Sequence, residues 1–467
     1  MTIRATYTFT DATNTAASYK NAIQSNLTAA VEAWSKVLAG DASIQISVQT
    51  SGSIGSNYGG GFAADLVTHG VSGGKYQTEA TFGHQIRTGI DANGSKFDAN
   101  IIINGYGLDE FFFDPSPYDS GGDIPSDKYD FYSLMLYSVG KALGFHGFQT
   151  AAASIYSRTY KTIYDDLVVY KGGTPYFSGE NVRKYYGSDL ALNPNDIYSI
   201  NTKIYNGEQF TNSAVSESVL LGQRRQISAI EKAMLADQGI GTDQADILKA
   251  HIDVSGKSIK LNAGAGTDTI VYDGRKADYS VKYSAADGTY KVTGKGYADT
   301  LISAEQIRFS DGTYWIEDAA GVTNGVHRFY NTATNSHFYT GSNAETNSVR
   351  TSMPYAVEEG FAFASASGKT GLEVFRFQNE KTGAYFYTIS TSERDSILKS
   401  LPQFSYQGSS FKAYTADNGP QEELYRFYNT ASGAHFFTTS EAERDNIVAN
   451  LPLLTYEGVA FYVDIMT

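Results

Sequence analysis

The chain has 467 residues, a net charge of −14, and a composition that is 41% hydrophobic and 18% charged. This composition is typical of a folded chain of about two to four domains and excludes a disordered one. The absence of Cys excludes disulfides and thiolate metal sites. No basic cluster favours nucleic acid as a partner, and no apolar run is long enough to predict a membrane span.

The first residues, MTIRATYTFT, lack the charged head and apolar core of a cleaved signal peptide. On this point alone a cytoplasmic protein is the default prediction. A Cys-free, acidic chain rich in Gly and Tyr is equally typical of bacterial proteins that are exported in one step without a cleaved N-terminal signal. The start of the chain and its composition are therefore consistent with a cytoplasmic protein and with an exported one.

Residues 1–242 predict a mixed α/β domain. Apolar residues recur at helical spacing over residues 18–40, 127–147 and 224–241, and each of these segments ends at or near Gly. Residues 42–52 alternate as a strand does, and residues 98–107 are typical of a buried strand.

Two further regions complete an α+β multidomain chain. Residues 243–322 carry short alternating runs, and the sequence of 278–296 predicts a hairpin that turns at ADG. Residues 323–467 contain three similar copies, at about 325–366, 371–415 and 422–464, each with the pattern strand, turn, strand, short helix, strand. One copy alone does not bury its aromatic face, so we expect the three to pack around a common axis.

The segment YSVGKALGFHGF, Tyr137–Phe148, partly matches the zinc helix HExxHxxGxxH. In that pattern two His on one helical face bind zinc, the Glu is the general base, and a Gly turns the chain toward a third ligand. The pattern places its two helical ligands at Tyr137 and Lys141 and its base at Ser138. The turn falls on Gly144 and the third ligand on Gly147, with His146 one residue away.

This region resembles the bacterial secreted, matrixin-like metalloproteases of the metzincin group. The resemblance rests on residues 114–148, 156–182 and 224–241 and covers roughly residues 1–242. Catalytic members carry the His, Glu and His that are missing here. They also carry a methionine turn, where residues 213–223 contain no Met.

We therefore interpret the domain as a pseudoprotease and expect no zinc. A protonated Lys141 has no lone pair for a metal, Tyr137 binds one only as phenolate, and Ser138 is too weak a base to replace Glu. Lys141 either fills the former metal position paired with a carboxylate, or forms a reactive amine–phenol pair with Tyr137. If zinc is bound after all, the remaining candidate ligands are His69, His84 and His146.

Residues 263–271, AGAGTDTIV, match one GGxGxDxUx nonapeptide with Ala in place of the first Gly. With residues 298–315 they resemble the RTX-type region of type I secreted proteins, in which calcium lies between successive turns. Calcium is the one cofactor that this resemblance suggests. Only one turn here supplies its Asp, which is Asp268. The resemblance also implies type I secretion to the extracellular medium or the cell surface.

The three copies resemble a bacterial repeat domain of unknown function that is appended to secreted hydrolases and cell-wall lysins. Their shared motifs are RFYN, GAHFxTTS, ERD and YEGVAFY. Aromatic and polar residues at equivalent positions either hold each hairpin together or form a glycan-binding set. That set comprises His337, Tyr385, His435, Arg328, Arg376 and Arg426.

Three functions fit these observations. The first is a secreted, non-catalytic surface or extracellular-matrix protein that is built on an inactivated protease scaffold and associates with itself. The second is an adhesin that binds cell-surface glycan through the repeats. The third is a hydrolase with a non-standard site near Lys141 or in the acidic segment 114–130.

Overall fold

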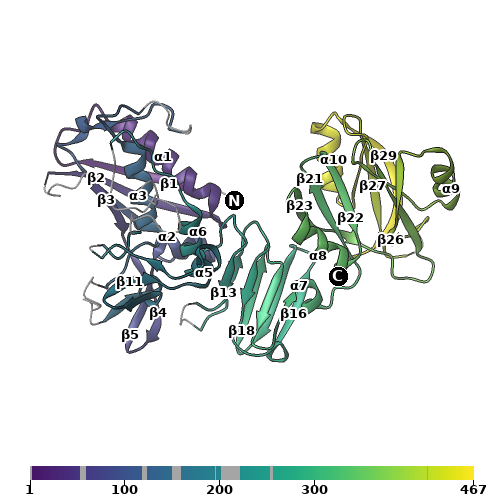
Figure 1. Cartoon of the computed structure of the whole chain (residues 1–467), viewed down its shortest axis with the longest axis horizontal. Helices are drawn as coiled ribbons and strands as arrows, with labels where there is room; N and C mark the ends of the chain where they lie inside the picture. Colours follow the sequence, from purple (N-terminus) through teal and green to yellow (C-terminus); the bar gives the residue numbers. More distant parts are fainter. Residues whose placement is uncertain are drawn as a thin grey trace. The chain divides into compact units, whose positions relative to one another are not determined.

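The computed structural model describes residues 3–52, 59–117, 124–149, 159–194, 196–200, 221–252, 256–417 and 419–466. The chain is a mixed α/β protein, as predicted, and divides into two compact units. One consists of Met1–Val281 with Tyr290–Ile316, and the other of Lys282–Thr289 with Glu317–Thr467 (Figure 1). The predicted middle region therefore belongs mostly to the first unit. None of the described helices is long and apolar enough to cross a membrane.

A four-stranded sheet organises the N-terminal part of the first unit. Strands β1, β2 and β6 run parallel, and β3 closes one edge antiparallel to β6, in the order β1-β2-β6-β3. The bounds are β1 Ile3–Asp11, β2 Ala42–Ser51, β3 Gly59–Ala63 and β6 Ala99–Asn104.

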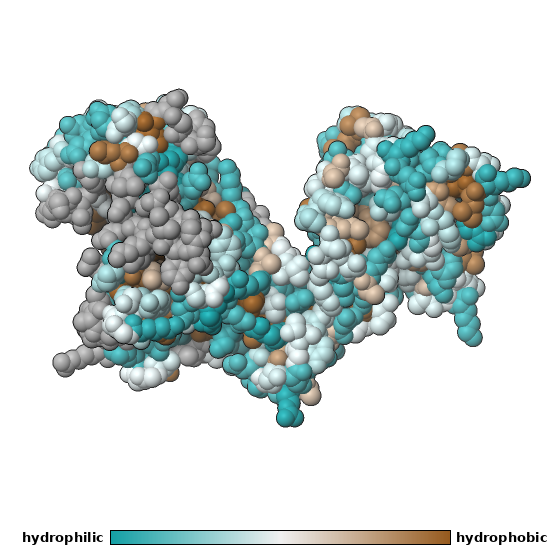
Figure 2. All heavy atoms as spheres, in the orientation of Figure 1, coloured by the Kyte–Doolittle hydropathy of each residue, from teal (hydrophilic) through white to brown (hydrophobic). Residues whose placement is uncertain are grey.

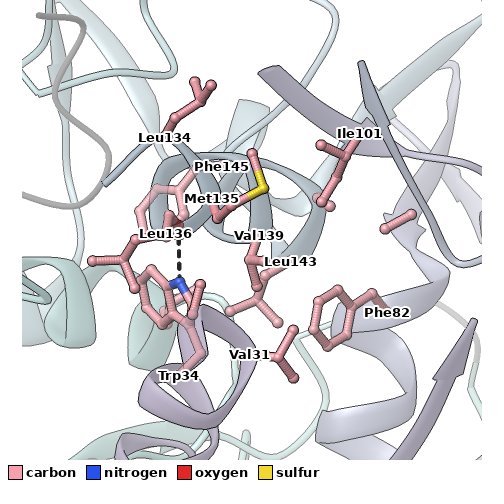
Figure 3. Packing of buried hydrophobic residues seen from close by; sticks show 14 of the residues in the cluster. Val31, Trp34, Phe82, Ile101, Leu134, Met135, Leu136, Val139, Leu143 and Phe145 are labelled. Carbon is pink, nitrogen blue, oxygen red and sulfur yellow. Dashed lines mark hydrogen bonds between the residues drawn. The ribbon is translucent and has the colours of Figure 1, made fainter. Parts of the chain in front are cut away.

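Helices α1 (Lys20–Val37) and α3 (Phe131–Leu143) pack together beside this sheet, and Trp34 joins them (Figure 3). The indole N–H of Trp34 donates to the carbonyl of Leu136 at 3.0 Å inside the apolar cluster. A buried indole needs such a partner, because an unpaired buried donor costs about 1–3 kcal/mol. Helix α3 begins where Asp130 accepts the Ser133 N–H and ends at Gly144, close to the predicted boundary.

Smaller elements complete this part of the unit. Helix α6 starts later than predicted because Ser228 and Glu231 form a capping box. The bounds are β4 Leu66–Ser72, β5 Lys75–Ala80, α2 Thr81–Thr88, η1 Leu108–Glu110, β7 Phe111–Phe112, β8 Tyr129–Asp130, β9 Tyr160–Thr162, α4 Ile163–Asp166, β10 Val168–Lys171, β11 Thr174–Phe177, α5 Glu180–Tyr186, β12 Leu190–Ala191 and α6 Ala229–Asp237.

The middle region winds through two small sheets. Strands β13, β15 and β19 stack in parallel, so that Leu248, Ile270 and Ile307 lie side by side and are fully buried. The second sheet has the order β14-β18-β17-β16, and the predicted hairpin supplies its last two strands. The bounds are β13 Ile247–Lys249, β14 Lys260–Asn262, β15 Thr269–Val271, η3 Lys276–Asp278, β16 Tyr279–Ser284, β17 Thr289–Gly294, β18 Tyr297–Ile302, β19 Gln306–Phe309 and β20 Gly312–Trp315.

Each of the three similar segments forms two strands, a helix and a third strand, after a short helix α7 (Ile316–Ala320). The first comprises β21 Gly325–Asn331, β22 Ser336–Thr340, α8 Asn343–Ser352 and β23 Ala356–Ala364. The second comprises β24 Leu372–Asn379, β25 Tyr385–Thr388, α9 Thr391–Ser400 and β26 Phe404–Ala413. The third comprises β27 Gln421–Asn429, β28 His435–Thr438, α10 Glu441–Asn450 and β29 Leu454–Asp464.

Three equivalent aromatic rings meet at the centre of these segments. Tyr339, Tyr387 and Phe437 form a triangle with centroids 5.6–5.7 Å apart and interplanar angles of 85–88°. This edge-to-face arrangement is a favourable one for aromatic rings. The strands of the first and third segments join in one six-stranded sheet of order β22-β21-β23-β29-β27-β28, and those of the second form the three-stranded sheet β25-β24-β26. The strands of each segment also pack against that segment's own helix, through Val349, Ile397 and Ile447 respectively.

The hydroxyl of Tyr339 ties the first segment to the third. It accepts the Phe437 N–H at 2.8 Å and donates to the Phe437 carbonyl at 3.0 Å.

We predict that Tyr339→Phe destabilises the C-terminal unit by about 1–3 kcal/mol, because both buried backbone groups lose their partner. Calorimetry of the full chain and hydrogen exchange of the β28 amides measure this. Tyr406→Phe is the control, because Tyr406 is 41% exposed. An equal loss in both variants would contradict the prediction.

Candidate functional site

A cleft of about 480 Å³ lies between the edge strand β3 and the end of helix α3. Among the five degenerate zinc-helix positions, Tyr137, Lys141 and Gly147 line this cleft. Ser138 does not, because it is buried and donates to the Leu134 carbonyl at 2.7 Å. Gly144 is the C-cap of the helix, outside the cleft.

Strand β3 approaches the helix so closely that Gly61 has no room for a side chain. A Cβ on Gly61 would lie 2.0 Å from the Ser138 carbonyl oxygen. A Cβ on Gly147 would lie 2.3 Å from a carboxylate oxygen of Asp165. The Asp165 carboxylate therefore occupies the space that a side chain at position 147 would need.

The ammonium of Lys141 is held by three acceptors. It donates to Asp196 at 2.9 Å, to the Tyr198 carbonyl at 2.8 Å and to the Ser199 hydroxyl at 3.0 Å. An ammonium has three N–H donors, so this set uses all of them. Burial alone would raise the pKa of Asp196, but Lys141, the Ser199 hydroxyl and the Tyr198 N–H together hold that pKa below its usual value. Lys141 is thus paired with a carboxylate, which is one of the two alternatives that the sequence left open.

Two cations lie near the ring of Tyr137. The Lys141 Nζ is 5.3 Å from its ring centroid and the Arg225 Cζ is 5.0 Å from it. Cations at this distance from an aromatic ring are attracted by its electron-rich face. Both cations therefore stabilise the position of the ring.

The imidazole of His146 also borders the cleft. Burial and the nearby Lys141 ammonium lower the pKa of His146 to about 4, so the ring is neutral at pH 7. None of the described residues lining the cleft is an Asp or Glu. The segment 213–220, where a methionine turn is expected, lies outside the described residues, as does part of the acidic segment 114–130.

The other two histidines proposed as zinc ligands lie apart from the cleft, around a carboxylate that the sequence analysis missed. His69 Nε2 and His84 Nδ1 each lie 3.1 Å from Oε2 of Glu79. Arg87 donates to both oxygens of the same carboxylate, at 3.0 and 2.8 Å. Burial alone would raise the pKa of Glu79, but Arg87 and the two imidazoles hold it well below its usual range.

Asp268 stands in a ladder of three acidic residues, each directly before a parallel strand: the buried Asp246 and Asp268, and the partly exposed Glu305. The Oδ1 of Asp268 accepts the Asp246 N–H at 2.7 Å, and the Asp268 N–H donates to Glu305 at 2.8 Å. Burial and the neighbouring Glu305 raise the pKa of Asp268 to about 9, and burial raises the pKa of Asp246 to about 7. Among the described residues, no partner faces the buried Oδ2 of Asp268.

The six candidate glycan-binding residues lie in three separate seams between the repeats. His337 contacts Phe436 edge-on at 4.9 Å, Tyr385 contacts Phe338 at 5.2 Å, and His435 contacts Phe386 at 5.6 Å. In each seam the ring from one repeat therefore packs on a Phe of the next. The structure does not gather the six residues into one site.

The arginines of the set are ion-paired at these seams. Arg328 pairs with Glu359 and Glu443, Arg376 with Glu345, and Arg426 with Glu457. Glu345 and Glu443 come from helices of neighbouring repeats, so Arg328 and Arg376 bridge two repeats. In the first repeat Glu359 also pairs with His337, and in the third repeat Glu457 also pairs with His435. The second repeat has Tyr385 and Gln407 at the equivalent positions.

Residues 325–464 match a family described as a domain of unknown function, DUF5648. The matched segment coincides with the three repeats. No curated protein and no solved structure matches the chain.

We predict that Lys141→Met destabilises the N-terminal unit by about 2–4 kcal/mol, because it leaves Asp196 charged and without its main partner. Urea unfolding followed by tryptophan fluorescence measures this, since Trp34 and Trp315 both lie in that unit.

The stability from the lowered Asp196 pKa is present above about pH 4 and is lost as the pH falls through the folded-state pKa. The variant should therefore lose part of this acid dependence. Lys96→Met, at a 74% exposed side chain, should change little, and equal effects would contradict the prediction.

We predict the opposite pH dependence for the acidic ladder. The folded-state pKa values of Asp246 and Asp268 are raised, so their contribution to stability falls as the pH rises from about 4 to about 9. Asp268→Asn should raise the unfolding free energy at the alkaline end by on the order of 1–2 kcal/mol. Urea unfolding across this range tests it. If calcium binds at Asp268, millimolar calcium will raise the unfolding free energy of the wild type at alkaline pH and will leave that of the variant unchanged.

Proposed function

We propose that this chain is a secreted, non-catalytic bacterial surface or extracellular-matrix protein that associates with itself. Its N-terminal unit is a metalloprotease-like scaffold in which the zinc chemistry has been replaced by structural contacts. Export follows the type I route that the middle region suggests.

The observation that carries this proposal is the environment of Lys141. All three donors of its ammonium are used by Asp196, Tyr198 and Ser199. A nucleophilic lysine needs a nitrogen lone pair that faces the substrate, and here the nitrogen is held by three acceptors instead. Lys141 stands where the zinc pattern has a metal ligand. Its ammonium thus acts as a structural cation that joins helix α3 to residues 196–199.

The space around the cleft supports the same conclusion. The Asp165 carboxylate occupies the space that a side chain at position 147 would need. The hydroxyl of Ser138 is turned into the helix, where it donates to a backbone carbonyl. A third zinc ligand at position 147 would therefore also require the Asp165 side chain to move.

Exposed apolar residues on the C-terminal unit support self-association. Val448 is 60% exposed, Leu453 58% and Leu398 53%. Leu398 on α9 and Val448 on α10 occupy equivalent positions in two repeats. Apolar residues reach the surface of this unit in several patches (Figure 2). Contiguous apolar surface on a monomer commonly marks an interaction site.

Light scattering of the purified full-length protein tests this proposal. We expect particles well above monomer size without added carbohydrate, which distinguishes self-assembly from glycan binding. The double variant Val448→Glu with Leu453→Glu should reduce the particle size, because it places charge in the apolar surface. The double variant Lys96→Glu with Lys171→Glu is the control, because both side chains are already exposed and charged. A wild type that stays monomeric at all concentrations would refute self-association.

A protease assay on the same sample tests the absence of catalysis. We expect no cleavage of an unfolded protein substrate, with or without added zinc. Cleavage that persists with a chelator and disappears in Lys141→Ala would instead establish the non-standard hydrolase.

A further inference from the structure

We propose that His69, Glu79 and His84 form a binding site for one divalent transition-metal ion, with zinc as the representative ion. The site is independent of the cleft at α3 and of the proposed function. It would be structural, fastening the β4–β5 hairpin to helix α2.

The spacing of the three ligand atoms matches zinc coordination. His69 Nε2 and His84 Nδ1 are each 3.1 Å from Glu79 Oε2, and all three atoms lie within 4.8 Å of one another. Ligands that bind one tetrahedral zinc ion at about 2.0–2.2 Å lie about 3.2–3.6 Å apart. An ion can therefore be placed among these atoms with small side-chain adjustments.

The backbone aims the three side chains at one point. His69 is the extra residue of a β-bulge in β4, where the register with β5 shifts between Thr68 and Gly70. Bulges re-aim a side chain and are frequent beside functional sites. Glu79 lies near the end of β5, and His84 follows in the first half of α2. Three consecutive elements thus contribute one ligand each.

The side chains are shielded from water before any ion binds. Their exposed fractions are 3% for His69, 8% for Glu79 and 11% for His84. Imidazole and carboxylate are common zinc ligands, and two His with one carboxylate suit divalent iron as well. Such burial is typical of a structural ion rather than one open to substrate.

Arg87 fixes the position of the Glu79 carboxylate. It already donates to both oxygens of Glu79, so the carboxylate has a cationic partner without either imidazole. Both imidazole nitrogens nevertheless converge on the same oxygen, Oε2, which Arg87 also contacts. In metal sites, a ligating carboxylate is commonly held by a further hydrogen bond, and Arg87 would supply it.

Cobalt binding to the metal-free, full-length protein tests the proposal. We expect one equivalent of Co²⁺ to give a visible absorption band that one equivalent of Zn²⁺ abolishes. His69→Gln and His84→Gln should each weaken binding at least about tenfold, because each removes a ligand. His251→Gln is the matched control, because that His pairs with Asp299 without a second imidazole and should leave the affinity unchanged.

X-ray absorption of the zinc-loaded wild type gives a second measurement that does not depend on the variants folding. We expect about two imidazole ligands and oxygen ligands, with no sulfur, around each ion. Failure of the folded wild type to bind cobalt or zinc stoichiometrically would overturn the proposal. Binding that is unchanged in both His variants, or a first shell without imidazole, would overturn it as well.

Discussion

The cleft of the N-terminal unit depends on the buried ammonium of Lys141. Its three acceptors come from residues 196–199, far along the chain, so this one cation fastens that segment to the end of helix α3. The Asp196 oxygen that accepts from Lys141 also accepts the Ser199 hydroxyl at 2.6 Å, and the other carboxylate oxygen accepts the Tyr198 N–H at 3.2 Å. A buried charge is tolerated only when it is paired and hydrogen-bonded, and here the pairing determines which groups line the cleft.

In the C-terminal unit, buried polar groups are satisfied by partners in neighbouring repeats. Its central rings are aromatic, and the hydroxyl of Tyr339 satisfies backbone groups of Phe437 in another repeat. Around them, Arg328 and Arg376 cross the seams to carboxylates at the starts of neighbouring helices. Each repeat therefore completes the next one, which is the physical reason that a single copy is not expected to fold alone.

Much of the fold was predictable because its signals are local. The helix that carries Tyr137 and Lys141 has apolar residues at helical spacing, an Asp cap and a Gly end, and it lies where the pattern predicts. The three repeats show the predicted order of elements for the same reason, and a Ser caps each of their helices. The start of α6 was placed too early because its capping box, Ser228 with Glu231, outweighs the periodicity before it.

The sequence by itself indicated three helices and two strands of residues 1–242, the hairpin, the repeats and the absence of the zinc-helix residues, because each of these depends on residues close together in the chain. Only the tertiary structure decided the partners: Asp196 for Lys141, Glu79 for His69 and His84, and Glu305 for Asp268. It also decided that the six candidate glycan-binding residues lie in three seams. Such partners meet through sheet register, bulges and helix packing, and a one-dimensional pattern does not specify which distant charge will face another once the core has closed.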